Sequence, residues 1–473
     1  MQLPIVTVAP IVQAHAEAFR DLFGDERQFR HFQNYLSGLI VLDNKSLANI
    51  SRCILDSADK TNLSRFLSLS PWQPSEVDER RVQYMLGQTM EVRQDANHSY
   101  LILDDTLCEH VGSLFEYIDK HYNHSNNTYP LAHNIVTSHY LSGAVRFPID
   151  FELYRRYEEV TRWHEFVHRH FPEQEIPSTA TARLGLHRKL ESELLKDPEY
   201  AALAQQFHSK IELAKALVSK AVERKLPFST VLMDSWYLSP ELITCLNQNQ
   251  KDWVSLLKHN RNLEVHSFQI KDAQGQPIPL PGEHIKVEDL VPLIPAQAYR
   301  EIKIREQSYW CFTRTVRIPS IGKVRLVISF ETPELSGTYA VLVSNRTDWS
   351  ASEILFRYLQ RWSIETFYRD GKQLLGLGDY RMRTLEAIQA HWCLVFVAYS
   401  LLHLACLPPS SPKRRGKVPS LPRQSIGEAC RQQGQALIQA LILVAHDLLQ
   451  QGHSAAQVLS DLFAKQQGEP ITL

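Results

Sequence analysis

The chain has 473 residues, of which 44% are hydrophobic and 22% are charged, and its 51 Lys and Arg nearly balance 52 Asp and Glu. This length predicts two to four domains, and the near-zero net charge excludes an attraction of the whole molecule to nucleic acid or membrane. Seven scattered cysteines without a C-x-x-C pair argue against a disulfide framework and a cysteine zinc site, and favour a cytoplasmic protein.

Helical periodicity dominates residues 10–95, so residues 1–97 are expected to form a helical N-terminal region. Within it, "NKSLANISRCIL" and "TNLSRFLSLSPW" each begin with a capping residue and lie a short turn apart. They could be a helix-turn-helix that turns Arg52, Lys60 and Arg65 toward the phosphates of DNA ends. Two ordinary bundle helices would give the same pattern. The N-terminus also lacks the basic segment of a signal peptide, which again favours the cytoplasm.

From Tyr100 onward, short apolar runs predict strands. "YLILDD" ends in Asp104 and Asp105, and "NIVTSHYL" and "AVRFPIDFELY" follow as two β-like runs. Residues 152–225 return to a charged helical pattern, after which "FSTVLMDSW" predicts a buried strand that ends at Asp234.

The second half of the chain alternates between strand and helix patterns. Residues 241–345 are β-rich, with turns at Pro and Gly. Helical character returns in 346–407 and includes an apolar run of about 15 residues from Cys393 that is too short for a membrane span and predicts a buried core helix. Residues 408–423 read as a proline-rich basic linker that contains "KRRGK", and 424–473 as a helical C-terminal region.

The stretch "YLQRWSIETFYRDGK", residues 358–372, predicts one uninterrupted helix with a strongly polar face. Five of its positions fall within about 80° of one another on a helical wheel: Tyr358, Arg361, Glu365, Arg369 and Lys372. The opposite side is apolar and should face a core: Phe356, Leu359, Phe367 and Leu374. One interpretation is a solvated face with i,i+4 ion pairs, such as Arg361 with Glu365. The other is a functional face.

Three carboxylates favour the functional interpretation. Asp104 and Asp234 each end an apolar strand, and Glu365 lies on a helix that follows the β-rich stretch. Strand ends in α/β folds gather at one edge of the sheet, where ligands bind. Carboxylate oxygens suit Mg²⁺ or Mn²⁺, and three of them can hold two ions about 4 Å apart for phosphodiester chemistry. Because Asp104 and Asp105 are adjacent, strand alternation sends them to opposite faces.

The segment Tyr358-x₂-Arg361-x₃-Glu365-x₆-Lys372 matches the Tyr-Arg-Glu-Lys signature of the DDE transposases of bacterial insertion sequences, in the superfamily named after insertion sequence four. "LILDDT" resembles the first acidic motif of these enzymes, and this alignment favours Asp104, with Asp105 as the fallback. "VLMDSWYLS" resembles the second. The interval from Asp234 to Glu365 (365 − 234 = 131 residues) suits the β-strand insertion that the family carries. The resemblance covers residues 100–400.

The resemblance implies an α/β fold: an RNase H-like mixed sheet with a core at 98–240 and 346–407, interrupted by the β-rich insertion at 241–345. It implies a recombinase that pairs the inverted-repeat ends of its element on DNA as a homodimer and, with Mg²⁺ (or Mn²⁺ in its place), cuts and transfers strands. Asp104, Asp234 and Glu365 would hold the metals. DNA contacts would come from Tyr358, Arg361, Lys372 and Arg369. Family members also use an aromatic residue that receives a flipped base, for which Trp310 is the candidate here.

Two alternative functions are open. "HEFVH", His164 to His168, is a literal H-E-x-x-H zinc motif with Glu165 as the base and Glu191 as a third ligand, which would indicate a metalloprotease. The same motif arises easily by chance in a chain with 20 histidines, and its surroundings read as an exposed charged helix. An inactive DNA-binding remnant of a transposase is the other alternative, although all three acidic positions and the full signature are occupied.

Overall fold

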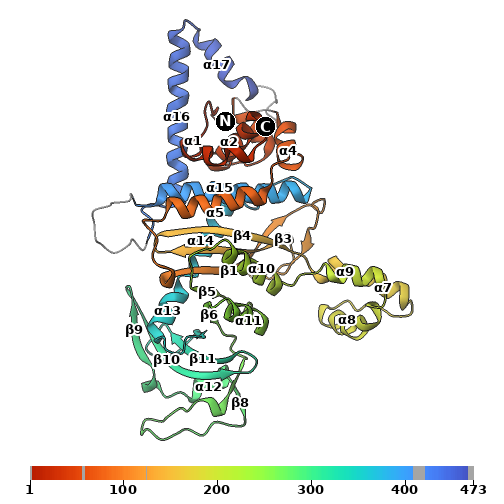
Figure 1. The fold of residues 1–473 in the computed structure, drawn as a ribbon, viewed down its shortest axis with the longest axis vertical. Coiled ribbons are helices and arrows are strands. Elements are labelled where there is room, and N and C mark those ends of the chain that lie inside the picture. The colour runs from red at the N-terminus through yellow and green to blue at the C-terminus, as the bar shows by residue number, and fades with distance from the viewer. Residues whose placement is uncertain (1–2, 56–58, 124, 409–420, 467–473) are drawn as a thin grey trace.

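The computed structural model describes residues 3–55, 59–123, 125–408 and 421–466. One ten-stranded mixed sheet runs through the molecule (Figure 1), with strands in the order β2-β3-β1-β5-β6-β12-β11-β10-β9 and with β4 paired to β3. Its strands are β1 Ser99–His110, β2 Asp119–Lys120, β3 Leu131–Ser142, β4 Val145–Tyr154, β5 Thr230–Met233, β6 Asp252–Leu256, β9 Arg300–Ile304, β10 Gln307–Ile318, β11 Gly322–Phe330 and β12 Tyr339–Ser344. A separate pair joins β7 Asn262–Glu264 to β8 His284–Lys286.

Pairing direction divides the sheet into two halves. Strands β1, β3 and β4 are antiparallel neighbours, whereas β5 lies parallel to β1 and β6 parallel to β5. The β9–β12 meander then extends the same sheet through an antiparallel contact between β12 and β6. The β-rich range 241–345 is therefore continuous with the rest of the sheet, and its first strand, β6, pairs within the parallel half.

The two faces of the sheet carry separate cores because side chains alternate along each strand. On β1, Tyr100 and Ile102 belong to one core with α14 and α15, while Leu101 and Leu103 belong to the other with α10 and α11. The helices of the first core are α13 Ala351–Leu359, α14 Trp362–Leu374 and α15 Leu385–Cys406; those of the second are α10 Lys210–Glu223, α11 Pro240–Gln248 and α12 Val287–Leu290. Helix α5 Pro74–Gln88 contributes to both, with Val77 in the first core and Val82 and Met85 in the second.

Helix α15 is the central helix of the first core. Its 22 residues extend well beyond the predicted apolar run, and by length and composition it could cross a membrane. However, 89% of its most apolar stretch is buried inside the protein, between α2, α4, α5 and the sheet. A buried core helix passes the same test, so the prediction that this run is a core element fits the structure.

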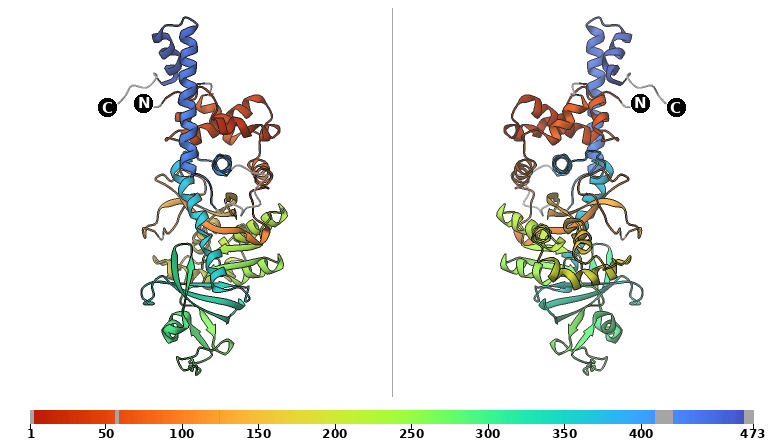
Figure 2. Two further views of the ribbon diagram at one scale, coloured as in Figure 1. Left: turned by 90° about the vertical axis from the view of Figure 1, so that its left-hand side faces the viewer. Right: turned by 90° about the vertical axis from the view of Figure 1, so that its right-hand side faces the viewer.

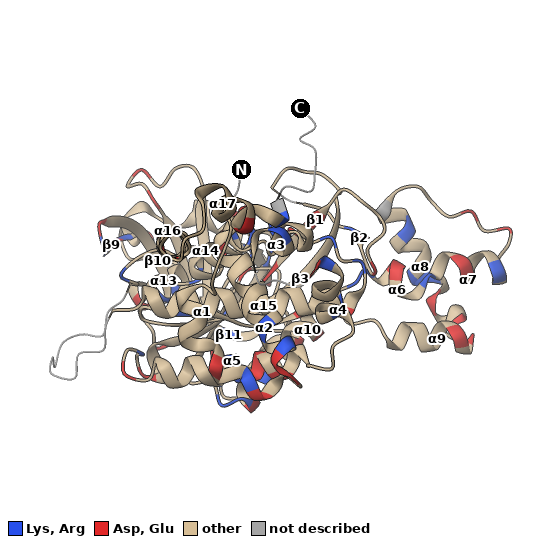
Figure 3. Cartoon of the chain, turned by 90° about the horizontal axis from the view of Figure 1, so that it is seen from above, with Lys and Arg blue, Asp and Glu red and all other residues tan. Residues whose placement is uncertain are grey.

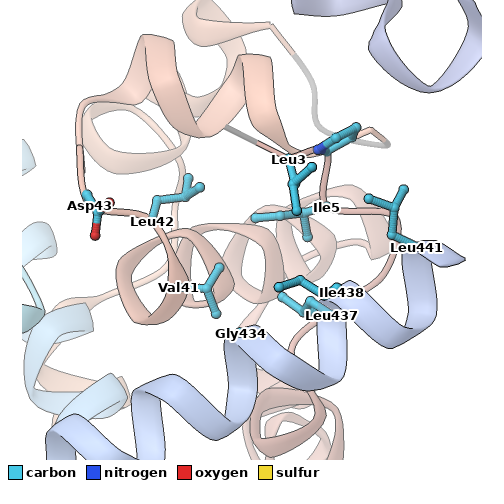
Figure 4. A pocket seen from close by; sticks show the side chains of 10 residues that line it. Leu3, Ile5, Val41, Leu42, Asp43, Gly434, Leu437, Ile438 and Leu441 are labelled. Atoms are coloured by element: carbon cyan, nitrogen blue, oxygen red, sulfur yellow. The ribbon is translucent and has the colours of Figure 1, made fainter. Parts of the chain in front are cut away.

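The described N- and C-terminal regions are helical, as predicted, and they pack together above the sheet (Figures 1 and 2). The elements are α1 Pro10–His15, α2 Glu26–Val41, α3 Leu47–Cys53, α4 Lys60–Ser68, α16 Ile426–Gln450 and α17 Ala455–Phe463. Between the N-terminal segment, α2 and α16 lies an apolar groove of about 250 Å³ (Figure 4), lined by residues that include Leu3, Ile5, Leu42, Leu437, Ile438 and Leu441. Helices α3 and α4 pack against each other and leave Lys60 and Arg65 exposed. The "KRRGK" run lies outside the described residues.

A small helical module interrupts the chain between β4 and α10 and projects from the sheet (Figure 1). It contains α6 Tyr157–Thr161, α7 Trp163–His170, α8 Ala180–Leu194 and α9 Pro198–Gln205. The module has a core of its own, formed by Trp163, Phe166, Val167, Leu194 and Tyr200. Short 3₁₀ helices complete the chain: Ala16–Leu22, Ala96–His98, Val265–Ser267, Val291–Leu293, Ala296–Ala298 and Ala464–Gln466.

Candidate active site

The register between β1 and β5 brings the two strand aspartates together. Tyr100 lies beside Thr230 and Ile102 beside Leu232. Two residues further along each strand direction, Asp104 therefore comes next to Asp234. Strand β5 stops at Met233, but β1 does not end at its aspartates as predicted, because antiparallel pairing with β3 continues to His110. Beyond Asp104, the β5 side of β1 is therefore left open and becomes one wall of a cleft.

The signature segment forms two helices, so the prediction of one uninterrupted helix is wrong. Helix α13, begun by a capping box at Ser350, ends at Leu359, and α14 begins at Trp362. At the junction the backbone bonds tighten to i,i+3: the N–H of Arg361 donates to the carbonyl of Tyr358, and that of Ile364 to the carbonyl of Arg361. The break changes the helical phase, which leaves Phe356 44% exposed instead of in the core. Glu365 lies in the first turn of α14.

Arg361 ties the signature helix to β1. Its Nη1 donates to Asp104 Oδ2 at 2.6 Å and its Nη2 donates to Glu365 Oε1 at 3.2 Å. The Arg361 and Asp104 side chains are only 13% and 14% exposed, so this is not the solvated ion-pair face that periodicity alone allowed. The guanidinium also lies 5.9 Å from the ring centroid of Tyr358, whose pKa is raised to about 12, mainly by burial.

Negative charge accumulates around Asp104. Burial raises the pKa of this carboxyl, Arg361 lowers it, and the neighbouring Asp105, Asp234 and Glu365 raise it, which together bring the pKa to about 7. One arginine therefore faces several carboxylates from three separate elements. Such a group of carboxylates is stabilised by additional positive charge.

Asp105 points to the opposite face of β1 and is held by other partners. Its Oδ2 accepts from Lys210 Nζ at 2.7 Å, and its Oδ1 accepts from the Tyr237 hydroxyl at 3.0 Å. Asp234 is fixed through its own turn, where its Oδ1 accepts the backbone N–H groups of Trp236 and Tyr237 at 2.8 and 3.4 Å. Of the two adjacent aspartates, Asp104 is therefore the one on the face of β1 that packs against Arg361 and α14.

These residues line one polar cleft of about 710 Å³ at the level where β5 ends. The cleft is lined by Asp104, Asp105, Asp234 and Glu365, by the basic side chains of Lys210, Arg369 and Lys372, and by polar and aromatic residues that include Asn123, Trp236 and Tyr368. Arg361 adjoins it through its contact with Asp104, and Tyr358 lies beside Arg361. Arg369 also pairs with Asp370 at 2.9 Å.

The base-stacking candidate Trp310 is not among the residues that line the cleft. Trp310 lies on β10 between Glu301 and Phe330, where it packs half-buried against the second core. The sequence interpretation missed Trp236 and Lys210, which line the cleft. Trp236 could have been noticed, since it follows the second acidic motif by two residues. Lys210 had no local indication, because 105 residues separate it from Asp105.

The donor set fits a divalent cation. Within the described part of the chain, no group of three His, Cys, Asp or Glu side chains is close enough together to hold a metal ion. Arg361 lies between Asp104 and Glu365 and supplies the positive charge there. The oxygen-only donors and the crowded negative charge are those preferred by Mg²⁺ and Mn²⁺, so the chemistry of Asp104, Asp234 and Glu365 suits such an ion, although the three carboxylates do not converge as they lie.

The H-E-x-x-H motif lies on α7 of the helical module. His164 packs against the Trp163 ring at 4.3 Å, and the motif base Glu165 is exposed and pairs with Arg162 at 3.5 Å. Glu191, the expected third ligand, accepts from the Tyr157 hydroxyl at 3.5 Å. Within the described ranges, then, these residues do not assemble into a metal site.

Comparison with known proteins agrees with this geometry. Residues 202–401 match the family model described as "Transposase DDE domain", a range that contains Asp234 and Glu365 but not Asp104. The "Probable transposase for insertion sequence element IS701" of Microchaete diplosiphon is 21% identical over 392 residues, which cover 82% of this chain and 86% of that protein. Both comparisons show that the chain is similar to transposases, over the DDE domain in the first and over most of the chain in the second.

Proposed function

We propose that this protein is a transposase that cuts and rejoins DNA strands at the inverted-repeat ends of an insertion sequence. The observation that carries the proposal is the meeting of Asp104 from β1, Asp234 after β5 and Glu365 from α14 in one cleft with basic side chains at its wall. The matching transposase relative supports it.

In this proposal the three carboxylates hold Mg²⁺, with Mn²⁺ as a substitute. Bound ions would activate the attacking oxygen and stabilise the leaving oxygen of a phosphodiester. Arg361 is already positioned beside Asp104, so its guanidinium can release the carboxylates and donate to a phosphate oxygen instead. The Tyr358 ring supports that guanidinium, and the exposed Lys372 and Arg369 contact the strand along the same wall.

We also propose that the core is RNase H-like. The order β4-β3-β1-β5-β6, with three antiparallel strands followed by two parallel ones, supports this assignment. Residues 98–240 and 346–407 would form the catalytic core and 241–345 the insertion, although β6 pairs with the core strand β5. The N-terminal helices would bind the DNA ends, with Lys60 and Arg65 exposed for phosphates, in a cytoplasmic homodimer.

The decisive experiment incubates the purified protein with DNA that carries the ends of its source element, with and without Mg²⁺. The proposal expects nicks at the ends that require the ion, and joined products when target DNA is present. Asp234→Asn is the matched control, because it removes a carboxylate charge without changing side-chain size. Binding of the ends without any Mg²⁺-dependent nicking would favour the inactive remnant.

A further inference from the structure

The face of β3 that packs against α14 is unusually polar for the inside of a protein. The side chains on this face alternate along the strand and are those of Ile135, Thr137, His139 and Leu141. The first and the last belong to the first core, whereas Thr137 and His139 are polar and fully buried between them. Burying a polar group costs free energy unless the group is hydrogen-bonded, and an apolar residue would fill the same space without that cost. The partners of Thr137 and His139 are therefore informative.

Both polar side chains are hydrogen-bonded to α14. The hydroxyl groups of Thr137 and Tyr368 lie 2.6 Å apart, and His139 Nε2 lies 3.0 Å from the Ser363 hydroxyl. Tyr368 and Ser363 are also buried, so all four groups are shielded from water. Burial lowers the pKa of His139 well below its usual range, which keeps its ring neutral. Along α14, the two bonded residues lie on either side of Glu365.

On the strand side, the same contacts fall beside Asp104. In the antiparallel pairing of β1 with β3, Thr137 lies directly opposite Asp104, and His139 lies one side-chain row away on the same face. Tyr368, the partner of Thr137, lies about one helical turn beyond Glu365. The hydrogen bonds to β3 therefore join the strand row that carries Asp104 to the helical turns that carry Glu365.

We propose that Thr137 and His139 are positioning residues that set the separation of Glu365 from Asp104, the gap in which a divalent cation would bind. This inference rests on the proposed function of the cleft, and neither residue is among those that line it. Arg361 bridges the same gap, since it donates to both carboxylates. Hydrogen bonds are directional whereas apolar contacts are not, so these bonds restrain α14 against sliding and rotation over the sheet.

The test compares variants of the full-length protein that change one hydroxyl at a time. Thr137→Val removes the hydroxyl at nearly constant volume, whereas Thr137→Ser keeps it. Thr137→Val should need about tenfold more Mg²⁺ for half-maximal cleavage of the element ends, because groups that orient metal ligands affect metal affinity on this scale. Thr137→Ser should stay close to wild type. Both variants should bind the ends without Mg²⁺ as wild type does, because Thr137 does not line the cleft.

The partners on α14 test the same bonds from the other side. Tyr368→Phe removes the second hydroxyl of the Thr137 contact and should raise the Mg²⁺ requirement as Thr137→Val does. The double variant should be no worse than either single one, since all three lack the same bond. Ser363→Ala removes the partner of His139 and should raise the requirement by a smaller factor, about threefold.

Thr161→Val in the helical module is the matched control. Thr161 is as deeply buried as Thr137, and its hydroxyl donates to the carbonyl of Tyr157 at 2.8 Å. The control loses the same atoms and one buried hydrogen bond, so its melting temperature without metal should fall about as much as that of Thr137→Val. Its Mg²⁺ requirement for cleavage should remain that of wild type.

Melting with and without Mg²⁺ provides a measurement that does not depend on cleavage. Mg²⁺ should raise the melting temperature of wild type and Thr137→Ser more than that of Thr137→Val. A wild-type Mg²⁺ requirement in Thr137→Val, an equal rise in Thr161→Val, or additive losses in the double variant would overturn the positioning role.

The two proposals fail in different ways. If wild type does not cleave the ends but Mg²⁺ stabilises it more than Thr137→Val, the proposed function is contradicted and the positioning role stands. Cleavage by wild type with the same Mg²⁺ response in every variant does the reverse. A wild type that neither cleaves the ends nor responds to Mg²⁺ contradicts both.

Discussion

The cleft at the end of β5 and the helical module α6–α9 both carry residues of metal-binding type, but they differ in how those residues are assembled. In the module, His164, Glu165 and His168 come from one helix, and Glu165 is paired with Arg162. In the cleft, Asp104, Asp234 and Glu365 come from three elements that the sheet brings together. Residues distant in sequence that converge in space are far less easily explained by chance than a short motif.

Charge distribution separates the two regions further. The module mixes acidic and basic residues along its helices (Figure 3), and its ion pairs are mostly exposed, such as Arg169 with Glu199. Such pairs contribute little stability and attract no particular ligand. The cleft instead concentrates buried negative charge at Asp104 with one arginine beside it. That imbalance favours a bound cation.

The largest effect is expected from Asp234→Asn. This change removes a carboxylate from the proposed metal site while keeping the side-chain size and the Oδ1 acceptor for the Trp236 and Tyr237 N–H groups. Strand cleavage should fall by about a hundredfold or more, with end binding and melting temperature nearly unchanged. Cleavage at the wild-type rate would show that Asp234 is not part of the site, and the contrast with the helical module would then no longer hold.

The next test separates the adjacent aspartates. Asp104→Asn should reduce cleavage as severely as Asp234→Asn, because Asp104 faces Arg361 and Glu365. Asp105→Asn should retain more cleavage and instead loosen Lys210 and Tyr237, at a cost of about 1–3 kcal/mol in unfolding free energy. Cleavage assays and urea unfolding on both variants measure the two effects. If Asp105→Asn is the less active enzyme, the assignment of faces is wrong.

These two aspartates show how far the sequence reached. Apolar runs predicted the strands and their acidic residues, and alternation predicted that the two aspartates face opposite ways. Which face meets Glu365 depends on where α14 packs, and no local pattern contains that information. The wheel over 358–372 failed for Phe356 because the break at Gln360 and Arg361 shifts the phase between α13 and α14. The role of Lys210 could not be predicted from the sequence, because only folding brings this residue next to Asp105.

Arg361→Ala should have an intermediate effect on cleavage, about ten- to a hundredfold, since it removes a charge-assisted contact in a partly dry site. It also leaves Asp104 and Glu365 without their shared guanidinium, so the melting temperature should drop. Added Mg²⁺ should restore more of that drop than it raises wild type. Lys372→Ala, at an exposed position, should weaken end binding more mildly and leave the fold intact.

The Mg²⁺ response is the informative part of that experiment. A metal that fits between the carboxylates relieves the repulsion that Arg361→Ala exposes, whereas Lys372→Ala exposes none and should show no extra Mg²⁺ stabilisation. Equal Mg²⁺ shifts in wild type and Arg361→Ala would contradict the placement of Arg361 between the proposed ligands. Normal cleavage by both variants would indicate that the polar face of residues 358–372 has only a structural role, and it would weaken the assignment of Glu365.

The smallest effect is expected in the helical module. His168 is exposed, so His168→Ala should change the unfolding free energy by less than about 0.5 kcal/mol and leave cleavage at the wild-type rate. His164→Ala loses the contact with the Trp163 ring and should cost somewhat more stability, about 1 kcal/mol, again without loss of cleavage. Zinc analysis of the purified wild type should find no stoichiometric metal, because the motif residues do not converge. Stoichiometric zinc that disappears in His164→Ala and His168→Ala would restore the metalloprotease alternative. It would also show that a single helix can assemble here what the cleft needs three elements to build.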